Sequence, residues 1–182
     1  MNNIRVLKEQ YKLTKIKIIE NIKVDNFKKI VNNIEPGFLY SFVTRKSISL
    51  YTFILYAIKE YKQIDELILA TFKISKKPLL LLCDLILSGQ IKKTHILLCR
   101  WYKTIMNGAD NILEQKTKEI DNLTYSVDQT HAKVSLIKAG GKYLVLIGSG
   151  NYSENAKIEN YCLIDNEELY NFHKGWIYGK TS

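Results

Sequence analysis

The sequence predicts an α/β sandwich, in which helices cover a central sheet. Short apolar runs of strand length alternate with helical segments through the middle of the chain, and a series of strands followed by one helix closes it. The chain has 182 residues, of which 46% are hydrophobic and 25% are charged. It is therefore long and apolar enough to form a folded domain with a sizeable core.

The first third of the chain contains one undecided segment and two clear elements. Residues 15–24 form either a helix or a strand, and the pattern does not decide between them. Pro36-Gly37 is a turn, because both residue types interrupt regular structure. Residues 38–44 alternate like a strand, and residues 47–62 carry apolar side chains at helical spacing, which predicts a helix.

The middle third reads as strand, helix, strand, helix. Residues 66–72 (ELILATF) are a continuous apolar run, typical of a strand that is covered on both faces. Ser75 is a plausible N-cap for an apolar helix that ends at Leu87. Residues 94–99 (THILLC) predict a second buried strand, and residues 109–120 an exposed amphipathic helix.

The last third is richer in strands. Four strand-like segments are expected, at residues 123–127, 131–138, 142–147 and 158–164. Gly140-Gly141 joins two of them as a two-residue hairpin turn. Residues 166–178 form the closing helix.

The charge of the chain restricts the class of partner. The formal net charge is +9, which favours polyanions, and nucleic acid is the commonest of these. A genome that simply favours lysine codons would also give this excess. The longest apolar stretch, residues 79–87, is too short to cross a bilayer, so stable membrane insertion is not expected.

The cysteines and the first residues indicate a reducing compartment. Cys83, Cys99 and Cys162 are an odd number with no zinc-binding spacing, and each lies in an apolar run. Buried free thiols are the best interpretation. The opening residues lack the apolar core of a signal sequence, so we expect a cytoplasmic protein.

Four polar side chains stand out near the C-terminus. Residues two apart on a strand share a face, so His131 and Lys133 are expected to point the same way. Ser149 and Asn151 are also two apart and follow the apolar run YLVLIG. A helix that begins near Asn151 or Ser153 would add its N-terminal amides. An imidazole, an ammonium, a hydroxyl and a carboxamide at two strand ends suit the binding and attack of a phosphodiester.

These residues resemble the motifs of a known family. The phospholipase D superfamily is similar in three features: His131-x-Lys133, Gly148-Ser149-x-Asn151 and Glu159. The closest resemblance is to its small bacterial single-motif members, which include endonucleases. It extends from Asp65 to the C-terminus and implies a phospholipase D-like α/β sandwich, with a mixed central sheet flanked by helices.

The resemblance implies a role for each motif residue. In that family the motif histidine attacks phosphorus and forms a phosphohistidine, without metal or cofactor, and a second motif supplies the acid. His131 would be the nucleophile or the acid, and Lys133 and Asn151 would hold phosphate oxygens. Ser149 would line the site. Glu159 would accept a hydrogen bond from the other ring nitrogen of His131.

The resemblance also implies how the chain is organised. The family's site needs two motifs and this chain has one, so we expect a homodimer with one composite site. Residues 63–182 would form the catalytic domain, and residues 1–62 a helix–strand extension packed on it, the two making one composite domain.

One position departs from the motif. Lys138 stands where the family usually has an aspartate, which leaves turnover open and adds positive charge. This change favours a second interpretation, a catalytically impaired module that binds nucleic acid through its phosphate pocket. A third is a phospholipid-directed phosphodiesterase, if the basic N-terminal segment docks to anionic membrane.

Other residues are candidates for binding nucleic acid. Lys73 follows the first buried strand and either reaches a phosphate or is merely solvated. Arg100 and Trp101 follow the second buried strand, where they could hold a backbone phosphate and stack a base, although Trp101 could equally cap the core. His95 lies inside that strand and is expected to be a core or sheet-edge residue. Our first interpretation is a metal-independent nuclease that acts on DNA rather than RNA.

Overall fold

The computed structural model describes residues 15–19, 34–45, 50–153 and 158–179. The described strands are β1 (Lys15–Ile19), β2 (Phe38–Arg45), β3 (Glu66–Thr71), β4 (Thr94–Cys99), β5 (Leu123–Asp128), β6 (Val134–Ala139), β7 (Lys142–Gly148) and β8 (Ile158–Asp165). The described helices are α2 (Leu50–Tyr61), α3 (Lys76–Leu87), α4 (Tyr102–Ile105), α5 (Ala109–Glu119) and α6 (Glu167–Ile177).

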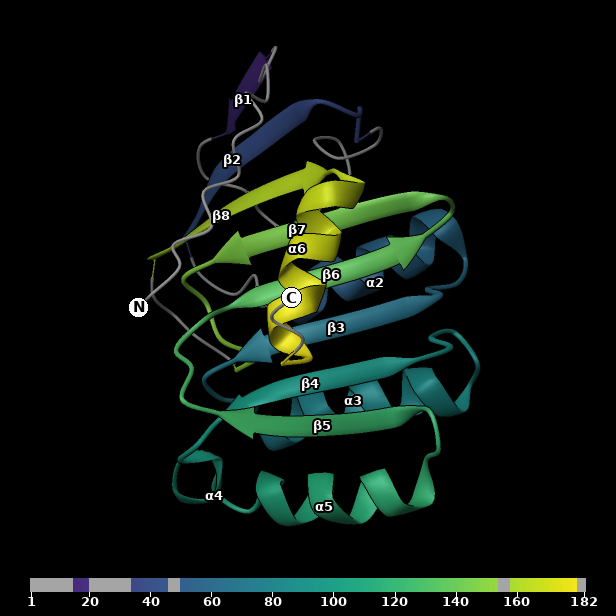
Figure 1. Ribbon diagram of the computed structural model, residues 1–182, viewed down its shortest axis with the longest axis vertical. Helices are drawn as coiled ribbons and strands as arrows, with labels where there is room; N and C mark the ends of the chain where they lie inside the picture. The colour runs from purple at the N-terminus through teal and green to yellow at the C-terminus, as the bar shows by residue number, and fades with distance from the viewer. Residues whose placement is uncertain (1–14, 20–33, 46–49, 154–157, 180–182) are drawn as a thin grey trace.

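All eight described strands form one mixed sheet, in the order β1-β2-β8-β7-β6-β3-β4-β5 (Figure 1). β3, β4 and β5 run parallel to one another, whereas β6, β7 and β8 are antiparallel to their neighbours. β3 joins the two halves, because it pairs with β4 in parallel and with β6 in antiparallel fashion. The predicted α/β sandwich with a mixed sheet is therefore confirmed.

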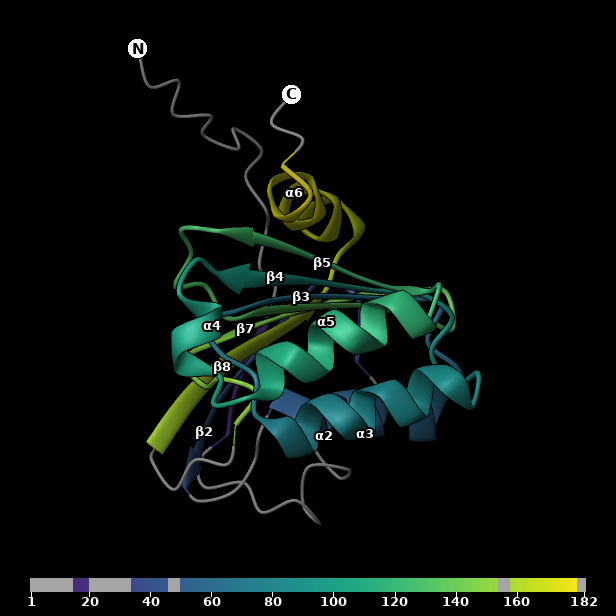
Figure 2. The ribbon, with the colours of Figure 1, turned by 90° about the horizontal axis from the view of Figure 1, so that it is seen from below.

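Helices cover both faces of the sheet (Figure 2). Among the described helices, α2, α3 and α5 lie on one face and α6 lies on the other. The strand β3 contributes apolar side chains to the cores on both faces of the sheet. Leu67 and Leu69 pack into the larger core with α2 and α3, and Ile68 and Ala70 pack beneath α6. Because successive side chains point to opposite faces, a strand covered on both sides must be apolar throughout.

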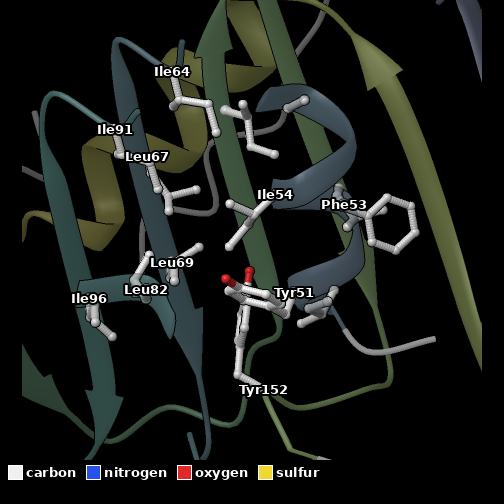
Figure 3. Close-up of a cluster of buried hydrophobic side chains, with 14 of the residues drawn as sticks. Tyr51, Phe53, Ile54, Ile64, Leu67, Leu69, Leu82, Ile91, Ile96 and Tyr152 are labelled. Carbon is white, nitrogen blue, oxygen red and sulfur yellow. The ribbon is translucent and has the colours of Figure 1, made fainter. Parts of the chain in front are cut away.

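The larger core lies on the face of the sheet that α2, α3 and α5 cover, and Figure 3 shows part of it. Ile54 of α2 and Leu82 of α3 are buried against it, as are Leu67 and Leu69 of β3. Each helix reaches the core through one apolar stripe at helical spacing, which is the pattern that predicted it.

The first described residues settle the undecided segment. Lys15–Ile19 is a strand that pairs with β2 in parallel, and residues 20–24 lie outside the described part of the chain. β2 in turn pairs with β8, and α2 contacts β6. The division of the chain between residues 62 and 63 stays a prediction.

The hairpin turn is confirmed. Gly140 and Gly141 have φ angles of 56° and 75°, and they join β6 to β7. A two-residue turn that matches the twist of its strands needs positive φ at both positions, and glycine adopts that conformation without a steric penalty.

One expectation near the motif is wrong, and a second is tested only in part. The strand expected at residues 131–138 begins only at Val134, which faces Ala70, the last residue of β3 paired with β6. Residues 131–133 precede it outside the described strands. The Lys133 carbonyl still accepts a hydrogen bond from the Gly148 amide of β7 at 3.1 Å, whereas the Ala132 amide donates to Thr130 Oγ1. No helix begins at Asn151, because the next residue, Tyr152, forms an isolated bridge with Ile74. A start at Ser153 stays a prediction, since residues 154–157 lie outside the described part of the chain.

The closing helix is capped as its sequence suggests. Asn166 precedes α6, and its side-chain oxygen accepts a hydrogen bond from the Leu169 amide at 2.7 Å. Glu167 and Glu168 occupy the first turn, where the helix dipole favours negative charge. Among the described helices, none has the length and apolar character needed to traverse a bilayer.

Candidate active site

The motif residues gather at one end of the sheet, which we call the site end. Here β3, β4 and β7 finish, and β6 and β8 begin (Figure 1). His131 and Lys133 lie just before β6, Ser149 and Asn151 lie just after β7, and Glu159 is the second residue of β8. Antiparallel pairing of these three strands therefore brings together residues that span 28 positions of the sequence.

His131 and Lys133 are in direct contact. The Nζ atom of Lys133 lies 2.9 Å from His131 Nδ1 and donates a second hydrogen bond to the His131 carbonyl at 2.7 Å. An ammonium group can only donate, so Nδ1 must accept and the neutral ring carries its proton on Nε2. The two side chains share a face as expected, although the segment is not part of the strand.

The Lys133 ammonium is largely withdrawn from water. The residue is only 8% exposed, whereas His131 is exposed. Burial lowers the pKa of Lys133, and the nearby carboxylate of Glu159 opposes this effect. A partly desolvated cation gains more from an anionic ligand than a fully solvated one, which suits Lys133 to holding a phosphate oxygen.

Phe72 is a site residue that the sequence did not reveal. Its ring lies 4.7 Å from the His131 ring, centroid to centroid, and its centroid lies 5.7 Å from Lys133 Nζ. It therefore orients the imidazole and receives the ammonium in a cation–π contact. Its place at the end of the apolar run ELILATF had marked it only as a strand residue.

Ser149 and Glu159 form a second contact pair. The Ser149 hydroxyl donates to Glu159 Oε2 and accepts a hydrogen bond from the Asn160 amide at 3.1 Å. Glu159 is 9% exposed. β8 thus holds Ser149 in place, and Ser149 in turn orients the carboxylate. The hydrogen bond expected between Glu159 and His131 stays a prediction.

Asn151 is held by β3. Thr71 Oγ1 shares its single proton between two acceptors, Asn151 Oδ1 at 3.4 Å and the carbonyl of Lys73 at 3.0 Å. The amide oxygen of Asn151 therefore faces the protein, and its NH2 group, a double donor, is the end that suits an anion. Lys73 is half-buried at the same site end, beside this contact.

Tyr161 explains the two glycines of the motif. It is buried under the connection after β7, and a Cβ atom at either Gly148 or Gly150 would overlap it. At Gly148 the added carbon would also approach the backbone oxygen of Asn160 at 2.7 Å. Glycine is required here so that the backbone carrying Ser149 can lie flat on an aromatic ring.

Arg100 and Trp101 also lie at the site end, after β4. Both are exposed, and Trp101 has 55% of its surface accessible. The Arg100 amide donates to the Asp128 carbonyl, which fixes the backbone there. Trp101 is therefore a surface residue rather than a member of the buried core, and its binding role stays a prediction.

The structure does not bring Lys138 to this group. Lys138 lies near the far end of β6 opposite Glu66, about 16 Å along the strand from Lys133. Its Nζ atom lies 4.9 Å from the Tyr143 ring centroid, and its hydrogen bond to Tyr143 raises its pKa. The departure from the motif therefore does not alter the charge beside His131.

The remaining histidines and cysteines have structural surroundings. His95 is buried between Thr124 Oγ1 at 2.9 Å and Ser126 Oγ at 3.0 Å, which confirms its core role. All three cysteines are free; Cys83 and Cys99 are buried and Cys162 is half-buried. Across the described residues, no group of three His, Cys, Asp or Glu side chains could hold a metal ion.

Comparisons with known proteins bear on the fold. No family model and no curated protein sequence matches the chain. A polyphosphate kinase structure from Porphyromonas gingivalis matches 79% of this chain and 26% of its own, with a TM-score of 0.58 and 13% identity. A phosphatidylserine synthase structure from Haemophilus influenzae Rd KW20 matches 75% of this chain and 36% of its own, with a TM-score of 0.51 and 12% identity.

The chain thus spans much less than half of either matched protein. Both belong to the phospholipase D superfamily, and identity this low bears on the fold alone. Together with the mixed sheet and its helices, these matches show that the chain has the phospholipase D-like α/β fold.

Proposed function

We propose that the chain is a metal-independent phosphodiesterase, a nuclease, that acts through a phosphohistidine in a composite site made by two copies. The observation that carries this proposal is the contact of His131 with Lys133, an exposed imidazole 2.9 Å from a buried ammonium. The fold supports the broader statement, phosphoryl transfer in a phospholipase D-type enzyme.

The reaction has two steps. In the first, His131 of one copy attacks phosphorus through a ring nitrogen lone pair, the bond to the leaving oxygen breaks, and His131 of the second copy protonates that oxygen. In the second, the second histidine takes a proton from water, whose oxygen attacks phosphorus and releases the first histidine. One histidine must start neutral and the other protonated, so the rate has a bell-shaped pH dependence.

Lys133 has two successive partners in this scheme. Without substrate its ammonium hydrogen-bonds to His131 Nδ1. A bound phosphate oxygen attracts it more strongly, because that oxygen carries charge. Nδ1 is then free to carry a proton toward Glu159, and Nε2 becomes the attacking atom. Asn151 holds a second phosphate oxygen through its NH2 group.

The proposed substrate is nucleic acid, and DNA before RNA. The net charge of +9 suits a phosphate polymer. Arg100 and Trp101, exposed at the site end, could bind a neighbouring phosphate and stack a base. The likeness to a phosphatidylserine synthase supports a second candidate, a phosphodiesterase that acts on phospholipid.

A nuclease assay in the presence of EDTA tests the proposal. Plasmid, single-stranded DNA and RNA are incubated with the native chain, with His131→Ala, and with the control His173→Ala, whose histidine lies on α6 and accepts a hydrogen bond from Trp176. We expect DNA cleavage that survives EDTA, is retained by His173→Ala, and falls by about a thousandfold or more in His131→Ala.

Other outcomes separate the alternatives. If the native chain binds DNA in a salt-sensitive way but does not cleave it, the chain is a nucleic-acid-binding module and not a nuclease. Hydrolysis of phosphatidylcholine vesicles without DNA binding would favour the phospholipid-directed enzyme. Cleavage abolished by EDTA would contradict the metal-independent mechanism.

A further inference from the structure

Two buried hydroxyl groups meet behind the candidate site. Ser135 on β6 is 0% exposed and Tyr152 is 1% exposed, and their oxygen atoms are 2.5 Å apart. Figure 3 shows Tyr152 inside the larger core, to which Tyr51 of α2 also belongs. One hydroxyl donates to the other, so each satisfies a group that would otherwise be buried without a partner.

Packing alone does not explain this pair. A phenylalanine and an alanine would fill nearly the same volume without moving any hydroxyl out of water. Burial also raises the pKa of Tyr152, so its proton stays in place over the working range of pH. A hydrogen bond, unlike a contact between two apolar side chains, has a preferred direction and length. It can therefore fix the distance between the two chain segments that carry Ser135 and Tyr152.

Those segments carry the two phosphate-binding candidates. Ser135 is two residues after Lys133 in the chain, and Tyr152 directly follows Asn151. The backbone of Tyr152 is also tied down, because its carbonyl accepts a hydrogen bond from the Ser75 amide at 2.9 Å. Tyr152 therefore connects the segment after β7 to β6 by its side chain and to the start of α3 by its backbone.

We propose that Ser135 and Tyr152 are positioning residues, whose hydrogen bond fixes the spacing of Asn151 relative to Lys133. Neither touches the substrate. The proposal rests on the proposed function only in that Lys133 and Asn151 would bind two oxygens of one phosphate group; the hydrogen bond between Ser135 and Tyr152 is independent of turnover. A misplacement of about 1 Å in such a site can reduce a rate by about a hundredfold.

Three variants and one control test it. Tyr152→Phe and Ser135→Ala each leave one buried hydroxyl without its partner, so both are expected to lose stability. The double variant removes both hydroxyls and should recover most of the native thermal midpoint. Tyr170→Phe is the matched control, because it removes a buried tyrosine hydroxyl that donates to Glu66 at 3.0 Å, at the other end of the sheet.

The first measurement is hydrogen exchange, which needs no ligand. In the double variant we expect the Ser75 amide, the partner of the Tyr152 carbonyl, to exchange about tenfold faster than in the native chain. Amides of β4 and the Tyr170→Phe control should show no such selective change at Ser75. Equal Ser75 exchange in the native chain and the double variant would overturn the proposal.

The second measurement is the affinity for inorganic phosphate. We expect the double variant to bind it about tenfold more weakly despite its recovered stability, and Tyr170→Phe to bind it normally. If the double variant binds phosphate as tightly as the native chain, the Ser135–Tyr152 pair has only a structural role, and the inference is refuted. If the native chain neither binds phosphate nor cleaves DNA, the proposed function fails, and the exchange of Ser75 alone decides whether the pair positions Asn151.

Discussion

At the scale of single residues, the chemistry of His131 depends on its neighbour. Lys133 is a donor only, so its contact at 2.9 Å makes Nδ1 an acceptor and places the ring proton on Nε2. Phe72 supports the same ring from the side. In the proposed mechanism, Nε2 is the attacking atom, and it has no free lone pair while it carries this proton. It becomes available only when Lys133 leaves Nδ1 for a phosphate oxygen, so the arrival of substrate would activate the nucleophile.

His95 leads to a prediction about stability and pH. Burial lowers the pKa of His95 below its usual value of 6.5, so the unfolded chain binds this proton more readily than the folded chain. As pH falls from 6.5 toward the lower folded pKa, the free energy of unfolding must therefore decrease. We expect His95→Gln to flatten this decrease, as measured by urea unfolding at a series of pH values. A variant with the native slope would show that His95 does not contribute.

At the scale of elements, the connection after β7 depends on Tyr161. A Cβ atom at Gly150 would overlap the Tyr161 hydroxyl, while the ring carbon behind it lies at 3.1 Å. We expect Gly150→Ala to lower the free energy of unfolding by about 1–3 kcal/mol and to reduce activity by displacing Ser149. Adding Tyr161→Phe removes the overlapping oxygen atom, so the double variant should recover both the free energy of unfolding and the activity.

Thermal unfolding and DNA cleavage measure this recovery. Gly141→Ala is a useful comparison, because a Cβ atom there meets nothing within 4 Å, although its φ of 75° disfavours alanine. It should lose stability through backbone strain and should not be rescued by Tyr161→Phe. If Gly150→Ala behaves like Gly141→Ala, the packing of the connection on Tyr161 is not what requires glycine.

At the scale of the whole molecule, the proposed site needs two copies of the chain. If each site uses His131 from both, mixed dimers of native and His131→Ala chains are inactive. Unfolding and refolding the two in equal amounts should then leave about a quarter of the activity of the same total amount of native chain. Chains that act singly would leave about half, and that result would exclude the composite site.

Much of the fold was predictable because it depends on patterns among residues that are close in the sequence. The apolar run of β3, the helical spacing of α5 and the Gly140-Gly141 turn each involve neighbouring residues only. The start of β6 was not predictable, because a strand lasts only as long as its partner, and pairing with β3 stops at Val134. Before Val134 the chain keeps one backbone hydrogen bond to β7, from the Gly148 amide to the Lys133 carbonyl, and His131 lies outside the described strands.

By itself, the sequence determined the α/β class, the run of elements and the set of side chains that could bind and attack a phosphate. These follow from periodicity and from the chemistry of each residue, which need no distant partner. Only the tertiary structure decided that Phe72 joins His131, that Thr71 holds Asn151 from 80 positions away, and that Lys138 lies at the opposite end of the sheet. Such contacts depend on how strands far apart in the chain are paired, and the sheet order sets that pairing.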